Sequence, residues 1–128
     1  MAMADWLAVA AGGATGALLR FASNDAMTRA VGSGFPWGIL LVNVVGSMAM
    51  GVLYVLLSEQ ELLPGPWRVA LTVGLLGAFT TFSTFSLQAV QLLESGRLLA
   101  ALAYCMGSVV LCVGSAFAGV LVTRAFAS

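Results

Sequence analysis

A run of hydroxyl and aromatic residues near the middle of the chain is the segment best suited to bind an ion. Five Ser and Thr residues and two phenylalanines fill positions 80–86, and Gly74 and Gly77 precede them. Hydroxyls and glycines weaken the helical hydrogen bonds, and backbone groups freed inside a membrane must be satisfied by protein, ion or water. The run predicts a helix break between Gly77 and Thr80, with carbonyls able to meet a cation. The alternative is a continuous helix whose hydroxyls bond to the preceding turn.

Aromatic rings recur within the same run. Phe79, Phe82 and Phe85 stand at every third position among the hydroxyls. Such spacing is typical of lipid or core contacts. A sharper interpretation uses the polarity of the ring, because an aromatic edge is positive and its face negative. Ring edges beside Ser and Thr hydroxyls could hold a small anion in a narrow path without the full charge that would trap it.

Two further polar residues lie within apolar sequence. Asn43 follows Leu41-Val42, and an amide there is costly unless it is hydrogen-bonded, so we expect it to face other helices. It is either a clasp between helices or a donor to an anion. Arg20 either extends its charge to the membrane surface or raises the anion concentration at a pore entrance.

A polar stripe is predicted near the C-terminus. Tyr104, Ser108 and Ser115 share one helical face, and Cys112 lies close to it. Seven helical residues would separate Cys105 from Cys112 by ~10.5 Å, which is too far for a disulfide within the chain. We expect both cysteines to behave as small buried apolar residues.

The elements that position these residues must be membrane helices. Of the 128 residues, 61% are hydrophobic and 8% are charged, with no Lys or His and zero net charge. Soluble chains carry about 25% charged residues, so most of this surface is expected to face lipid. A neutral chain without a basic cluster gives no reason to expect nucleic acid as a partner. The first apolar stretch has no basic start, so we expect no signal-peptide cleavage.

Four stretches reach the ~20 apolar residues that a span requires. They are residues 4–22, 38–57, 67–93 and 98–122. The linkers are too short for a second domain, so residues 1–128 form a single four-helix transmembrane domain of the all-α class. Gly12 and Gly16 have the spacing of close helix contacts.

The arginines are nearly balanced between the two ends of such a bundle. An even number of spans puts both termini on one side, with Arg68 and Arg124, while Arg20, Arg29 and Arg97 lie on the other. Positive charge normally fixes orientation, and two against three gives almost no bias. The chain could insert in both orientations and pair as an antiparallel homodimer, or keep one orientation despite the weak bias.

The span centres contain no Asp, Glu, Lys or His. A proton-coupled transporter normally needs such a group within the membrane, so passive conduction is favoured. No nucleophile–base pair or metal-ligand cluster is present either, so we expect no enzyme. One alternative is a dual-topology exporter of organic cations, which would want a membrane-embedded carboxylate. Another is a structural subunit of a larger complex, which would not explain the hydroxyl and phenylalanine run.

Taken together, these residues resemble the Fluc (CrcB) family of bacterial fluoride ion channels. The similarity covers nearly the whole chain, and its most specific part is the run at positions 80–86. The matching segments are 12–20, which ends in Arg20, Pro36-Trp37-Gly38 with Val42, Asn43 and Gly46, and 74–86.

The resemblance implies a fluoride-selective channel that exports fluoride passively from the cytoplasm and relieves its toxicity. It implies a dual-topology antiparallel homodimer in the bacterial inner membrane, with the third helix of each subunit broken near the midplane and two pores per dimer. A structural sodium ion at the dimer interface would be bound by the backbone carbonyls of Gly77 and Thr80.

The resemblance also assigns side chains to the pore. Asn43, Phe82 and Phe85 match pore residues of the family, and Arg20 matches an arginine near the pore entrance. The remaining matches are the hydroxyl residues Ser83, Thr84, Tyr104 and Ser108. Cys112 stands where a hydroxyl might continue the polar track along the fourth helix.

Overall fold

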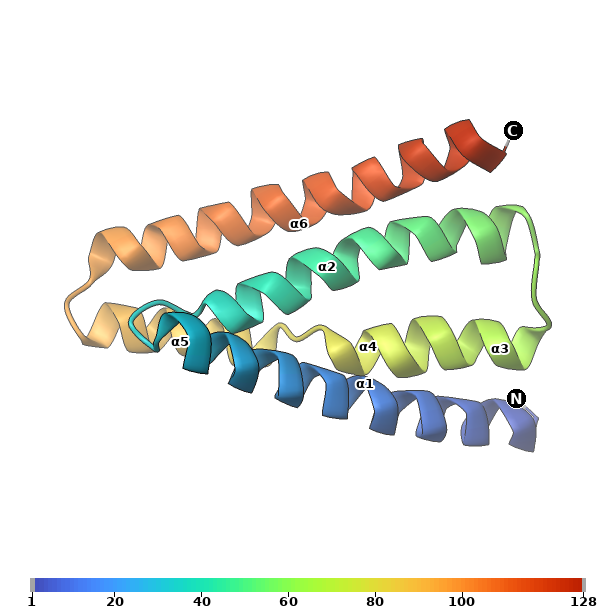
Figure 1. The fold of residues 1–128 in the computed structure, drawn as a ribbon, viewed down its shortest axis with the longest axis horizontal. Helices are drawn as coiled ribbons and strands as arrows, with labels where there is room; N and C mark the ends of the chain where they lie inside the picture. The colour runs from blue at the N-terminus through green and yellow to red at the C-terminus, as the bar shows by residue number, and fades with distance from the viewer. Residues whose placement is uncertain (1, 128) are drawn as a thin grey trace.

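The chain folds into four helical rods joined by short loops (Figure 1). The computed structural model describes residues 2–127. The first rod is α1 (Met3–Val31) and the fourth is α6 (Leu98–Ala127). The second is α2 (Trp37–Leu53) continued by the π-helical η1 (Tyr54–Glu59). The third consists of α3 (Gly65–Val69), the π-helical η2 (Ala70–Leu76), α4 (Gly77–Phe79) and α5 (Ser83–Glu94).

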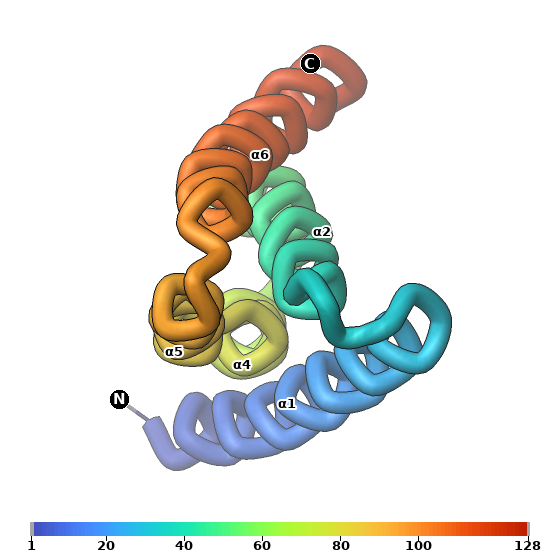
Figure 2. Tube along the Cα trace, turned by 90° about the vertical axis from the view of Figure 1, so that its left-hand side faces the viewer, coloured from blue at the N-terminus to red at the C-terminus, as the bar shows by residue number. Residues whose placement is uncertain are grey.

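The rods alternate in direction, and the two termini lie at the same end of the bundle, as the sequence predicts (Figure 1). Figure 2 shows α1 on one side, α2 and α6 on the other, and the third rod between them. The described residues contain no strand, so the all-α class is confirmed.

Three of the rods are long and apolar enough to cross a membrane: Trp37–Glu59, Gly65–Glu94 and Leu98–Ala127. The α1 helix is not among them, since its glycines and charges lower its mean hydropathy. It also runs nine residues past its predicted end at residue 22. An i,i+4 ion pair between Asp25 and Arg29 (3.1 Å) supports this extension. The helix ends only at Gly32, whose φ of 85° continues no right-handed helix.

Small residues bring the rods together. A Cβ atom on Gly12 or Gly16 would overlap the backbone carbonyl of Ala70 or Leu75. The spacing of Gly12 and Gly16 therefore does mark a close contact, between α1 and η2. Gly51 and Gly119 play the same part where α2 meets α6, since a Cβ there would meet backbone of the opposite helix.

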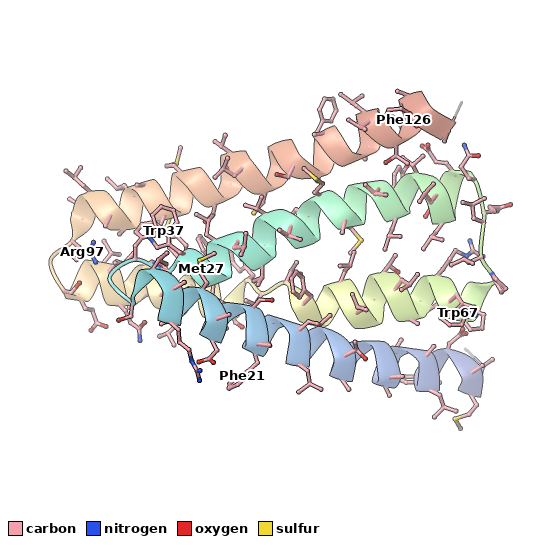
Figure 3. All side chains as sticks on the ribbon, in the orientation of Figure 1. Phe21, Met27, Trp37, Trp67, Arg97 and Phe126 are labelled. Atoms are coloured by element: carbon pink, nitrogen blue, oxygen red, sulfur yellow. The ribbon has the colours of Figure 1, made fainter. Side chains whose placement is uncertain are left out.

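The surface of the bundle is suited to lipid. Large apolar side chains are exposed along α1 and α6, and tryptophans are exposed at both ends. Trp37 lies near the end where loops join α1 to α2 and α5 to α6, which we call the loop end. Trp67 lies near the opposite end, which holds the termini (Figure 3). Tryptophans prefer the membrane–water interface, so the two rings mark the expected boundaries of the hydrocarbon layer.

Candidate functional site

The third rod is broken, as the hydroxyl-rich run predicts. Thr80 adopts an extended conformation (φ −87°, ψ 159°), and the helix resumes at Ser83. The break starts slightly later than predicted, because Gly77 remains helical (φ −61°, ψ −37°) and residues 80–82 leave the helix. The π-helical η2 lies just before it, and π-helical turns are frequent near functional sites.

Asn43 holds the broken segment from the neighbouring helix α2. Its Nδ2 donates to the Thr81 carbonyl at 3.0 Å, and its Oδ1 accepts from the Thr81 amide at 2.8 Å. The amide side chain thus satisfies both backbone groups of one residue in the break. These two bonds are those expected of a clasp between helices, and the predicted contact of Asn43 with an anion stays a prediction. One hydrogen of Nδ2 remains for another partner.

Thr81 also caps the helix that follows. Its Oγ1 accepts from the amide of Thr84 at 3.2 Å, in the manner of a helix N-cap. Upstream, the carbonyl of Leu76 accepts from the Thr80 amide at 3.1 Å and from the Thr80 Oγ1 at 2.9 Å. The hydroxyl of Thr81 thus replaces a helical hydrogen bond at the start of α5, while that of Thr80 adds a second bond at the last helical carbonyl before the break.

These side-chain bonds free two carbonyls. In a continuous helix the Thr81 amide would donate to the Gly77 carbonyl, and the Thr84 amide to the Thr80 carbonyl. Both amides bond to side-chain oxygens instead. Freed carbonyl oxygens are hard ligands of the kind that alkali and alkaline-earth cations prefer. Among the described residues, no cluster of His, Cys, Asp or Glu could hold a metal ion.

A cavity of about 500 Å³ lies beside the break, between α2 and α6. Asn43, Phe82, Phe85 and Ser108 line it, as do Gly77 and Thr80. Six of the residues predicted from sequence therefore meet at one site. None of the described residues that line this cavity is charged. An ion that enters would meet hydroxyl, amide and thiol groups, backbone carbonyls and aromatic rings, and no full charge.

The two phenylalanines differ in their surroundings. Their ring centroids are 5.4 Å apart, and both rings line the cavity. Phe85 is 8% exposed and belongs to the buried core, whereas Phe82 is 77% exposed. A large ring left this open on one protomer is available to lipid or to a second copy of the chain.

Ser108 is the side chain in this cavity that most clearly lacks a partner. It is 7% exposed, and its Oγ makes no hydrogen bond to the described protein. A buried hydroxyl without a partner costs roughly 1–3 kcal/mol. The free hydroxyl therefore indicates that the cavity is suited to a polar occupant.

Tyr104 lies behind the cavity rather than in its lining. It is 1% exposed, its ring centroid lies 4.9 Å from that of Phe85, and its hydroxyl donates to Gln88 Oε1 at 2.7 Å. Sequence reasoning missed Gln88. A glutamine within an otherwise apolar span was the available signal, because a buried amide needs a partner.

A second cavity, of about 470 Å³, opens at the loop end of the bundle. Most of the residues that line it are of polar types, among them Gln88, Gln91, Ser95 and Arg97. The Arg97 guanidinium, at the left in Figure 3, donates to the Gly34 carbonyl across this cavity. Since Phe85 lines the first cavity and Gln88 the second, the contacts from Phe85 through Tyr104 to Gln88 form the wall between them.

Besides Tyr104, three predicted residues are not brought into the first cavity. Ser83 is exposed at the start of α5, and Thr84 is half-buried with its amide capped by Thr81. Arg20 is half-buried on α1. None of the three lines either cavity, so their predicted contact with a permeating ion stays a prediction.

Comparison with known proteins identifies the family to which this arrangement belongs. Residues 7–120 match the family model described as CrcB-like protein, Camphor Resistance (CrcB). The chain belongs to the CrcB family. It is 45% identical over 118 residues to a protein of Nitrobacter winogradskyi, covering 92% of this chain and 94% of the relative. It is 45% identical over 116 residues to one of Magnetococcus marinus, covering 91% and 94%. Both relatives are named fluoride-specific ion channel FluC.

Proposed function

We propose that this member of the CrcB family is a fluoride-selective channel of the bacterial inner membrane, and that it lets fluoride leave the cytoplasm passively. The observation that carries the proposal is the uncharged cavity that combines the free Ser108 hydroxyl, the Asn43 amide and two phenylalanine rings. The names of the relatives from Nitrobacter and Magnetococcus support the same ion.

The chemistry of the cavity suits a small, strongly hydrated anion. Fluoride must exchange its water for close donors, and the remaining Nδ2 hydrogen of Asn43 and the hydroxyl of Ser108 are two such donors. The positive edges of Phe82 and Phe85 attract an anion without a full charge. Arg97 in the second cavity would attract anions to the loop end before they pass the wall at Tyr104.

The active unit in this proposal is an antiparallel homodimer in which α1 serves as a fourth span. The balanced arginines favour insertion in both orientations. The exposed Phe82 ring and the bare apolar face of α6 give each protomer a surface that a second copy could cover. A two-fold axis in the membrane plane would bring the two helix breaks together and yield two pores.

A structural sodium ion fits this dimer. The freed carbonyls of Gly77 and Thr80 from each protomer would supply four oxygen ligands on the axis, where the ion neutralises carbonyls that no amide satisfies. We expect the protein in detergent to unfold at a higher temperature in sodium chloride than in N-methylglucamine chloride, since a bound ligand stabilises the folded state. Equal unfolding temperatures would contradict the sodium site and leave the channel proposal intact.

Fluoride efflux from liposomes tests the function, with Ser108→Ala as the informative variant. Ser115→Ala is the matched control, since Ser115 lies on the same helix and lines neither cavity. We expect the wild type and the control to release fluoride rapidly, and Ser108→Ala to release it about tenfold more slowly, the effect of about 1.4 kcal/mol on the barrier. Equal rates of fluoride efflux from Ser108→Ala and Ser115→Ala would show that the Ser108 hydroxyl takes no part in conduction. Absence of efflux from inserted wild type would refute the channel.

A further inference from the structure

Cys112 lies in the cavity beside the helix break. It is half-buried, and it lines the cavity together with Ser108, which lies one helical turn away on the same face of α6. Cys105, the other free cysteine, lies outside this lining and packs against the buried core. The two thiols therefore have different access to whatever enters the cavity.

The cavity itself points to an occupant at this position. Ser108 lines the cavity and is 7% exposed, and its buried Oγ has no hydrogen-bond partner in the described protein. Its neighbours on α6, Val109 and Val113, are apolar. Ser108 and Cys112 thus carry the polar side-chain groups of α6 in this lining. The Cys112 thiol is a second possible donor to an ion, after the Ser108 hydroxyl.

We propose that Cys112 is a covalent modification site for small, uncharged thiol-directed reagents, and that capping this thiol closes the ion path. The inference rests on the proposed function, because it takes the cavity to be part of the fluoride pore. The ligand class is set by the site: the reagent must be small enough for a cavity of about 500 Å³ and must not need a counter-charge, since the lining is uncharged.

Methyl methanethiosulfonate fits these limits. The thiolate of Cys112 attacks the sulfenyl sulfur of the reagent, the new disulfide forms, and methanesulfinate leaves with the bonding pair. The thiol proton goes to water. The product carries a methylthio group in place of the S–H donor, so the polar stripe beyond Ser108 becomes apolar. A hydrophobic constriction stops ions because water leaves the constriction. We expect the capped cavity to block ions in this way.

Cys105 supplies the matched control. A reagent that reached both thiols equally, or that acted on the lipid, would affect Cys112→Ser and Cys105→Ser alike. After treatment, we expect the wild type and Cys105→Ser each to release fluoride about tenfold more slowly than the same protein without treatment. This corresponds to about 1.4 kcal/mol of added barrier. Treated Cys112→Ser should keep its own untreated rate. Dithiothreitol should restore the wild type, because it reduces the mixed disulfide.

Two measurements on the same liposomes make the test decisive. Peptide mass mapping shows which cysteine carries the methylthio group, and fluoride efflux shows the consequence. Modification of Cys112 without loss of efflux would overturn the inference, as would modification of Cys105 in place of Cys112. Should Cys112→Ser fail to insert, Cys112→Ala takes its place. If untreated wild type releases no fluoride, the proposed function fails, whereas failure of the inference alone leaves untreated efflux intact.

Discussion

Replacing Asn43 by Leu should weaken both the stability of the protein and the break in its third rod. Leucine has the same number of side-chain heavy atoms and the same branching at Cγ, so the change removes two hydrogen bonds and keeps the shape of the side chain. The bonds are those from Nδ2 to the Thr81 carbonyl (3.0 Å) and from the Thr81 amide to Oδ1 (2.8 Å). Both backbone groups of Thr81 then lose their partners within an apolar bundle.

The expected loss follows from these two groups. Each intramolecular hydrogen bond contributes about 1 kcal/mol net, and each buried group left unpaired costs roughly 1–3 kcal/mol. The freed Thr81 amide has an alternative, because it can return to the Gly77 carbonyl and extend the helix. The carbonyl of Thr81 has no such alternative. We therefore expect the free energy of unfolding to fall by about 1–3 kcal/mol.

Chemical unfolding in detergent measures the first effect, and amide hydrogen exchange at Thr81 measures the second. Ser47→Ala is the control, since Ser47 lines the same cavity one turn along α2 without a hydrogen bond to the described protein. A repaired helix should also weaken the stabilisation by sodium, because the Gly77 carbonyl is no longer free. The reasoning is refuted if Asn43→Leu matches Ser47→Ala in stability and leaves Thr81 exchange unchanged.

Two pairs of substitutions and one single substitution test the packing and the break. Gly16→Ala should lower the free energy of unfolding by about 1–3 kcal/mol, because its Cβ overlaps backbone of the third rod, whereas Gly107→Ala faces open space and should not. Equal unfolding curves would contradict that contact. Phe85→Ala should cost about 3–5 kcal/mol of stability, while the exposed Phe82→Ala should leave the unfolding of the protomer nearly unchanged and reduce fluoride efflux. Thr81→Val should cost about 1 kcal/mol and speed exchange of the amide three residues on; unchanged exchange would argue against the cap.

The sequence predicted the helix break from five hydroxyls in seven positions, because hydroxyls compete with the helical hydrogen bonds of the backbone. It placed the break a few residues too early, since the exact position depends on Asn43, which is 38 residues away and accepts from the Thr81 amide. The same limit applied to α1. Its polar second half looked like a loop, yet local pairs such as Asp25 and Arg29 continue the helix until Gly32.

Residues of the candidate site were predictable where the type or spacing of the residue itself was unusual for a membrane helix. Asn43, Phe82, Phe85 and Ser108 were found from their polarity or spacing and meet in one cavity. Gln88 was missed, because its role comes from the Tyr104 hydroxyl on another helix. Contacts between distant helices set which polar residues face each other, and no local pattern contains that information.

The most direct test of the central claim is the efflux of fluoride and of chloride from the same reconstituted liposomes under equal gradients. The account predicts rapid fluoride release with negligible chloride release, because the uncharged cavity replaces the water of a small anion with a few close donors. Chloride release as fast as that of fluoride would contradict selectivity, and release of neither ion from verified inserted protein would contradict conduction itself.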